Sequence, residues 1–262
     1  MRPRVLITGA SGGIGAELAR LFAEDDYELL LAARNLDALD ALAEELRAGR
    51  DVPVRTMRSD LSAPGAAERL WREAAGTDGT VDVLVNNAGA GVYGPFAEQD
   101  AEAVSRMLEL NVVALTALTR LALPGMVRRG TGRILNVASV VGYQPGGPRM
   151  AAYYASKSYV LAFSRGLARE LEGTGITVTA LSPGAMRTGF EARAGMPSTR
   201  VFRWFGNSVP AAVAKAGYRG LQRGRATVIP GWTTKLLAFA GELPPRRIAL
   251  AVNRFLLETG RG

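Results

Sequence analysis

The sequence contains no cysteine and no histidine. Without cysteine the chain cannot form a disulfide framework or use a thiol nucleophile, and its redox compartment cannot be inferred. Zinc sites built on either side chain are excluded as well, and we expect no metal site. Every catalytic dyad or triad that relies on a histidine base is excluded for the same reason. Several classes of catalytic site are therefore removed at once.

Long apolar runs are also lacking. No run approaches the roughly 18 residues of a membrane-spanning helix, and no signal-peptide pattern opens the sequence. We therefore expect a cytoplasmic protein.

The balance of charge is strongly positive, with a net charge of +8 over 262 residues. Such a charge raises the question of a nucleic-acid partner. All but three of the 32 basic residues are arginines, however, and they are scattered, with short pairs at 128–129 and 246–247. No recognition motif and no interleaving of aromatic and basic residues accompanies them. We expect no nucleic-acid partner; a basic site for a phosphorylated cofactor is compatible with the same charge.

Short apolar runs alternate with helical patterns along most of the chain. Strands are predicted at 4–8, 28–33, 54–58, 81–85, 133–137, 176–181 and 226–229. Apolar strands that alternate with helices pair in parallel, with both faces covered, and right-handed crossovers then give a doubly wound sheet. We predict an α/β, Rossmann-like doubly wound parallel sheet of about seven strands, in a single domain over residues 1–230. Residues 231–262 would form an amphipathic extension.

Ligands of such sheets bind beyond the carboxyl ends of the strands. The segments that reach this edge are 8–15, 34, 60, 86–89, 139 and 183–188. We expect the functional site there.

The first of these segments is rich in glycine, reading Thr-Gly-Ala-Ser-Gly-Gly-Ile-Gly over residues 8–15. Gly9, Gly13 and Gly15 would let the backbone turn tightly and approach a pyrophosphate at the start of a helix. The spacing differs from Gly-x-Gly-x-x-Gly, so a plain tight turn remains an alternative. The same residues also fit the Gly-x-Ser-x-Gly elbow of hydrolases, but that serine needs a histidine base and the chain has none.

Tyr153 and Lys157 stand four residues apart in a predicted helix, so their side chains share one face. A cation beside a phenol favours the phenolate and lowers the pKa of the tyrosine. A tyrosine with a lowered pKa suits a proton donor and acceptor for a carbonyl or an alcohol.

The end of the second strand bears on the choice of nucleotide. Folds that bind the unphosphorylated ribose place an acidic residue there, whereas this chain has Arg34. An arginine pairs with a 2′-phosphate, so we expect NADP(H) in preference to NAD(H), which remains possible. Arg34 as an ordinary surface arginine is the competing interpretation. Asp60 would accept a hydrogen bond from the adenine amino group or cap the next helix.

Taken together, these motifs resemble the short-chain dehydrogenases/reductases over residues 4–230. The resemblance rests on residues 8–15, Ser59-Asp-Leu61, Asn86-Asn-Ala-Gly89, Asn111, Ser139, Tyr153-x-x-x-Lys157 and Pro183-Gly-Ala-Met-Arg-Thr188, in the order and spacing of that family. It implies an oxidoreductase that transfers a hydride between a nicotinamide and a small carbonyl or alcohol substrate.

The resemblance also implies residue roles. Tyr153 would be the general acid/base, Lys157 would lower its pKa and bind the nicotinamide ribose, and Ser139 would hold the substrate oxygen. Asn111 would bind a water that relays protons to Lys157. Helix packing for Asn111 and helix capping for Ser139 are the alternatives. The implied cofactor-binding residues are Gly9, Ser11, Gly12, Gly13, Ile14, Gly15, Arg34, Asp60, Leu61, Asn87, Ala88, Gly89, Tyr153, Lys157, Pro183, Gly184, Met186 and Thr188.

Two segments bear on substrate and partners. Residues 196–205 hold Val201, Phe202, Trp204 and Phe205 among arginines, which suggests either a lid over an apolar carbonyl substrate or a subunit contact. The basic amphipathic tail could lie on an anionic membrane, although docking onto this or another subunit is favoured. We expect a homodimer or homotetramer. A non-catalytic NADP(H)-binding regulatory or membrane-surface protein on the same fold is the alternative function.

Overall fold

A computed structural model gives the fold of residues 2–76, 80–186, 189–196, 199, 208–242 and 246–257. Seven parallel strands form one sheet in the order β3-β2-β1-β4-β5-β6-β7. The strands are β1 (Arg4–Thr8), β2 (Glu28–Ala33), β3 (Val54–Arg58), β4 (Val83–Asn86), β5 (Gly132–Val137), β6 (Ile176–Leu181) and β7 (Thr227–Val228). The predicted α/β doubly wound sheet is confirmed.

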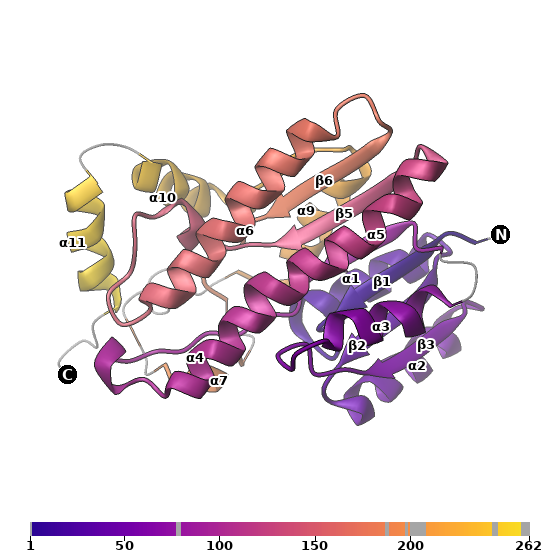
Figure 1. The fold of residues 1–262 in the computed structure, drawn as a ribbon, viewed down its shortest axis with the longest axis horizontal. Helices are drawn as coiled ribbons and strands as arrows, with labels where there is room; N and C mark the ends of the chain where they lie inside the picture. Colours follow the sequence, from indigo (N-terminus) through magenta and orange to yellow (C-terminus); the bar gives the residue numbers. More distant parts are fainter. Residues whose placement is uncertain are drawn as a thin grey trace.

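Helices cover both faces of the sheet, as Figure 1 shows. One layer holds α1 (Gly13–Glu24), α2 (Leu36–Gly49) and α9 (Pro210–Gln222), and the other holds α3 (Ala66–Ala75), α5 (Leu115–Arg129) and α6 (Ala151–Glu170). Alternation along β1 explains the two layers, because Val5 and Ile7 enter the first core and Leu6 enters the second. Both cores exclude water, so the sheet is a rigid platform for the residues at its edge.

The remaining helical elements lie around the carboxyl edge of the sheet or lead to it. They are η1 (Phe96–Glu98), α4 (Ala101–Leu108), η2 (Glu109–Ala114), η3 (Val140–Tyr143), α7 (Phe190–Arg193), α10 (Trp232–Glu242) and α11 (Arg246–Leu257). Helices α10 and α11 lie at the end of the molecule that the β5 arrow points to (Figure 1).

Strand order reverses between β1 and β4, because the chain winds outward to β3 on one side and to β7 on the other. The loops that follow β1 and β4 diverge at this point and leave a crevice beyond the strand ends. Below it, the buried Asn86 amide donates to Asn136 Oδ1 at 2.9 Å and to Thr119 Oγ1 at 3.1 Å, and Asn136 donates to Ser164 at 2.9 Å. These bonds tie β4, β5, α5 and α6 together beneath the crevice.

Residues Ala101–Arg129 form one 29-residue helical stretch through α4, η2 and α5, long and apolar enough to cross a membrane by length and composition alone. The sequence predicts a long helix at about 100–129 but no uninterrupted apolar run of membrane-spanning length. Its buried side chains Leu118, Ala122 and Met126 pack in the core beneath the sheet. A core helix passes the same test, so the stretch is weak evidence for a membrane span.

Candidate active site

A cavity of about 600 Å³ opens along the carboxyl edge of the sheet. It brings together most of the residues that the sequence analysis named: Gly9, Ser11, Gly12, Gly13, Ile14, Arg34, Asp60, Leu61, Asn87, Ala88, Gly89, Ser139, Tyr153, Lys157, Pro183, Gly184 and Met186 all line it. Gly15 and Asn111 are not in the lining and lie behind it, as described below. Thr188 falls outside the described residues, as do Val201, Phe202, Trp204 and Phe205.

The glycine turn between β1 and α1 forms one end of the cavity. Gly9 has φ +66°, a conformation that L side chains rarely adopt. A Cβ on Gly15 would lie 2.4 Å from the Gly9 carbonyl oxygen and 2.6 Å from Asn87 Nδ2, so only glycine fits there. At Gly12 a Cβ would meet nothing within 4 Å, and no side chain caps the first turn of α1. Free N–H groups at a helix start beside open space fit a phosphate group.

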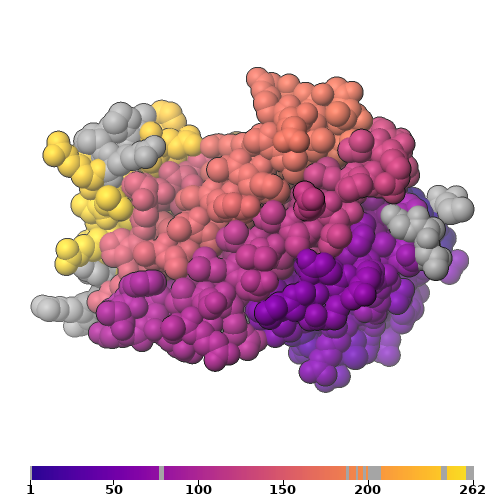
Figure 2. Space-filling model, viewed as in Figure 1, coloured from indigo at the N-terminus to yellow at the C-terminus, as the bar shows by residue number. Residues whose placement is uncertain are grey.

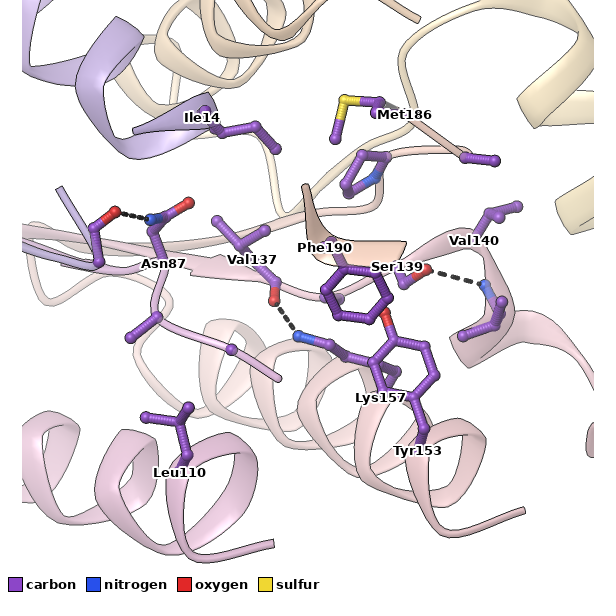
Figure 3. Close-up of a pocket in the computed structure, with 18 of the residues that line it drawn as sticks. Ile14, Asn87, Leu110, Val137, Ser139, Val140, Tyr153, Lys157, Met186 and Phe190 are labelled. Carbon is purple, nitrogen blue, oxygen red and sulfur yellow. Dashed lines mark hydrogen bonds between the residues drawn. The ribbon is translucent and has the colours of Figure 1, made fainter. Parts of the chain in front are cut away.

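Asn87 holds this turn against the end of β4. Its amide donates to the carbonyls of Thr8 at 2.9 Å and Gly9 at 3.0 Å, and the side chain lines the cavity, as do Ile14 and Val137 (Figure 3). In return, the Thr8 hydroxyl accepts from the backbone N–H groups of Asn87 at 3.0 Å and Ala88 at 3.1 Å. The cavity is thus fixed at the point where the strand order reverses.

The ends of β2 and β3 contribute charged groups. Arg34 follows β2, is exposed and lines the cavity. Asp60 follows β3, where its Oδ1 accepts from Ser62 and its Oδ2 accepts from Arg106 at 2.8 Å. Burial acts to raise the pKa of Asp60, but hydrogen bonds from Ser62 and the charges of Arg106 and Arg34 lower it further than burial raises it. Asp60 is therefore an ionised carboxylate that organises this rim.

Tyr153 and Lys157 come from the first two turns of α6 and are both buried at the cavity wall. Figure 3 shows both side chains on one face of the helix, with Ser139 beside the phenol. The Lys157 ammonium donates to the Val137 carbonyl at 2.9 Å. The helical spacing thus brings the pair into one site, as the sequence predicts.

The protonation of this pair differs from the expectation that Lys157 lowers the pKa of Tyr153. Burial raises the pKa of Tyr153 to about 12, although a hydrogen bond with Ser139 opposes the shift. Burial also lowers the pKa of Lys157 to about 8. A low-polarity surrounding disfavours both charged forms, and the lysine is turned toward a backbone carbonyl. The protein alone therefore holds Tyr153 as a neutral phenol.

Ser139 and Asn111 each have a structural role, which is the alternative to a role in the reaction. The Ser139 hydroxyl caps η3 by accepting from the Val141 N–H at 3.3 Å, while it also reaches the Tyr153 hydroxyl. Asn111 lies in the π-helical turn η2, where its amide bonds both backbone groups of Ala90 and donates to Ser156 at 3.1 Å. A π-turn widens a helix locally and is frequent at functional sites. Asn111 therefore holds the loop after β4 against α6.

The tail helices α10 and α11 build the far wall of the cavity, which is not predicted from the sequence. Leu237 of α10 and Asn253, Leu256 and Leu257 of α11 line it. Asn253 donates to the Gly146 carbonyl at 2.7 Å and to the Gln144 amide oxygen at 3.3 Å, and the Tyr93 hydroxyl donates to the Leu257 carbonyl at 2.7 Å. The amphipathic pattern of the tail predicts that one face of each helix is buried. It does not predict which part of the protein that face covers.

Comparison with known proteins agrees with this geometry. The profile of the short chain dehydrogenase family matches residues 3–197. Dehydrogenase/reductase SDR family member 7B from Bos taurus is 37% identical over 195 residues, which is 72% of this chain and 60% of the relative. Ketoacyl reductase HetN from Nostoc sp. is 30% identical over 253 residues, covering 93% of this chain and 86% of that protein. The chain thus spans about 60% of the length of the bovine relative.

Two solved structures extend the comparison to the whole fold. A short-chain dehydrogenase from Sphingobium yanoikuyae in complex with NADPH superposes with a TM-score of 0.80 at 37% identity, covering 91% of this chain and 92% of that chain. The bulky-bulky ketone specific alcohol dehydrogenase from Comamonas testosteroni gives 0.75 at 31% identity, with 91% and 92% covered.

The glycine turn supplies a first prediction. Gly15→Ala should weaken NADPH binding by about tenfold or more and lower the melting temperature, because the added Cβ would press on the Gly9 carbonyl and on Asn87. Gly166→Ala is the matched control, since a Cβ at this exposed position of α6 meets nothing within 4 Å. Fluorescence titration with NADPH and thermal melts measure both effects. Unchanged binding by Gly15→Ala would contradict the assignment.

The buried lysine supplies a second prediction. The folded pKa of Lys157 is about 8 against an ordinary 10.5, so the unfolded chain binds more protons between these values and stability rises with pH across that window. We expect the free energy of unfolding of the cofactor-free protein to gain about 1–3 kcal/mol from pH 8 to 10, relative to Lys157→Met. Tyr153, with a pKa of about 12, acts in the opposite direction only above its ordinary value of about 10. Urea unfolding at pH 8, 9 and 10 measures the difference, and parallel pH profiles for the two proteins would contradict it.

Proposed function

The chain belongs to the short-chain dehydrogenase/reductase family of nucleotide-dependent oxidoreductases, and on that premise we propose that it is an NADP(H)-dependent enzyme acting on a bulky, largely apolar ketone and its alcohol. The observation that carries the proposal is the convergence of Ser139, Tyr153 and Lys157 in the cavity that also contains the glycine turn (Figure 3). A protein that only sensed the nucleotide would not need this set of side chains.

The residues present fit a dinucleotide along the carboxyl edge of the sheet. The turn at Gly9, Gly12 and Gly13 would hold the pyrophosphate through backbone N–H groups, and the loop at Asn87 to Gly89 would lie along the adenosine ribose. Lys157 would bind the nicotinamide ribose, and Met186 would contact the nicotinamide. When bound, the cofactor supplies the hydride that reduces the carbonyl carbon.

The protein's own part in the reaction is to orient the substrate and transfer a proton. The Ser139 hydroxyl would hold the carbonyl oxygen beside the phenol, and Tyr153 would donate its proton as that oxygen gains charge. The phenolate left on Tyr153 then regains a proton from solvent. The raised pKa of Tyr153 keeps it protonated at neutral pH, ready to act as the donor in reduction.

Arg34 supports the proposed preference for NADP(H). It follows β2, lines the cavity and lies close enough to Asp60 to lower the pKa of that carboxyl. Asp60 is already paired with Arg106 at 2.8 Å, so the Arg34 guanidinium can donate hydrogen bonds to a 2′-phosphate. The NADPH bound by the Sphingobium relative is consistent with this choice.

The substrate class follows from the cavity wall opposite the nucleotide turn. Apolar side chains dominate it: Met150, Tyr154, Phe190, Met196, Leu237, Leu256 and Leu257. Phe190 lies against the Tyr153 ring, with centroids 5.4 Å apart and is drawn in front of the phenol in Figure 3. An apolar wall around the proton donor suits a bulky carbonyl compound, and the Comamonas relative is named for bulky-bulky ketones.

Self-association is part of the proposal. The outer surfaces of η2, α5 and α6 expose the apolar side chains of Val113, Val127 and Tyr159, and Tyr159 stacks on Phe163 at 5.8 Å. Apolar groups exposed on these helices favour a contact with a second copy of the chain. The homodimer or homotetramer expected from the sequence would use this face.

Removing the phenol hydroxyl tests the catalytic role. Tyr153→Phe should reduce turnover of a bulky ketone by roughly 10²–10⁴-fold, because positioned acid catalysis is lost, while NADPH binding stays within a few fold. Tyr154→Phe is the control, since this neighbour also lines the cavity but is not placed to donate the proton. NADPH oxidation followed by absorbance across a panel of bulky ketones gives the rates. Near-normal turnover by Tyr153→Phe would remove Tyr153 from the mechanism.

Reversing one charge tests the choice of nucleotide. Arg34→Asp should weaken NADPH binding by about 10–100-fold, the equivalent of one charge-assisted hydrogen bond, and leave NADH binding equal or better. Arg72→Asp on α3 carries the same change of charge at an exposed position outside the cavity and should leave both affinities unchanged. Titration with each nucleotide decides the matter. An unaltered NADPH affinity for Arg34→Asp would show that another residue discriminates.

A further inference from the structure

Helix α10 presents an apolar stripe to solvent. Trp232, Leu236 and Phe239 are 77%, 59% and 61% exposed. Their spacing of four and three residues places them on one face of the helix. The opposite face packs inward, where Thr234 and Ala238 are buried.

Helix α11 repeats the pattern. Ile248, Val252 and Phe255 follow the same spacing and are 60%, 45% and 46% exposed. Both helices lie at one end of the molecule, where Figure 2 shows the tail at the surface. The six side chains of the two stripes are therefore gathered on this end, in contrast to single exposed residues such as Phe96.

The inward faces of the two helices are anchored, so the stripes cannot turn in. Asn253 of α11 bonds Gly146 and Gln144, and the Gln144 amide donates to the Leu237 carbonyl of α10 at 2.7 Å. A rotation that buried the stripes would break these bonds and expose the cavity wall. The outward direction of the apolar side chains is thus a consequence of how the tail closes the cavity.

Positive charge flanks both stripes. Lys235 is exposed and lies three residues after Trp232 and four before Phe239, against the α10 stripe. Arg247 is exposed beside Ile248. In the described tail, residues 231–242 and 246–257, Glu242 is the one acidic residue, and Arg165 pairs with it at 3.2 Å.

Two occupants compete for such a face. A second copy meeting it about a two-fold axis would place basic groups opposite basic groups, at a cost in free energy. An anionic lipid surface offers acyl chains to the apolar stripes and phosphates to the basic flanks, as interfacial amphipathic helices require. We propose that α10 and α11 dock the protein on anionic membranes through these stripes.

Docking would also place the substrate cavity beside the lipid. The inner faces of the same two helices carry Leu237, Leu256 and Leu257, which line the cavity. The wall between cavity and membrane would then be one helix layer thick. Docking needs neither nucleotide nor catalysis. A protein that fails to bind membranes would therefore leave the proposed enzymatic function unaffected, and an inactive enzyme would leave the docking proposal unaffected.

Co-sedimentation with vesicles tests the proposal. The full chain should pellet with vesicles of equal parts phosphatidylcholine and phosphatidylglycerol, and much less with pure phosphatidylcholine. Trp232→Ser/Phe239→Ser and Ile248→Ser/Val252→Ser should each lower the vesicle partition coefficient by about tenfold or more, because each variant lacks two apolar side chains that docking would bury in the lipid. Lys235→Glu/Arg247→Glu should weaken binding to the anionic vesicles and remove its salt dependence.

Phe96→Ser/Val209→Ser is the matched control, because it removes apolar side chains that are 65% and 60% exposed and lie outside α10 and α11. This variant should bind like the wild type, and circular dichroism with nucleotide titration checks that every variant is folded. Failure of the wild type to pellet with anionic vesicles would overturn the proposal. So would equal binding by the stripe variants, or a dimer in light scattering that only the stripe variants convert to a monomer.

Discussion

The Thr8 hydroxyl is the contact on which the geometry of the site depends. It is buried at the end of β1, donates to the Val85 carbonyl of β4 at 3.2 Å and accepts from the N–H groups of Asn87 and Ala88. Strands β1 and β4 are neighbours at the point where the sheet reverses its order, so one side chain fixes the two loops that face the crevice. The Asn87 amide returns the bond to the glycine turn. Because the buried Thr8 hydroxyl makes all these hydrogen bonds, it holds the two loops rigidly. The position of these loops then determines where a dinucleotide can lie.

Burial is the main influence on the protonation of Tyr153 and Lys157, the pair on α6. Water exclusion moves the pKa of Tyr153 up to about 12 and that of Lys157 down to about 8, so both groups tend toward their neutral forms. The neutral phenol is the form that a carbonyl reduction consumes, whereas oxidation of an alcohol needs the phenolate. The cavity that we propose for an apolar substrate therefore also favours the proton-donating state.

Features that depend on local pattern could be predicted from the sequence, and features that depend on distant packing could not. Short stretches of sequence predict the seven strands, the glycine turn and the spacing of Tyr153 and Lys157, because their local residue pattern determines the structure. The Asp60 partner is different, because Arg106 lies 46 residues away. The raised pKa of Tyr153 reflects burial by several elements, which no spacing of two residues reveals. The role of Asn253 arises from bonds to Gln144 and Gly146, more than 100 residues earlier in the chain.

The exposed apolar side chains of α10 and α11 indicate function as clearly as the buried ones indicate the fold. Among the residues that the structure describes, no contact requires Trp232, Leu236 or Phe239 to be apolar, because the inward face of α10 already provides its contacts with η3 and the cavity wall. Polar residues at these positions would preserve the packing and avoid the cost of apolar surface in water. The same argument holds for Ile248 and Val252 on α11, at the same spacing. Single exposed apolar residues are common on proteins, but two aligned stripes beside basic groups are explained by something that covers them.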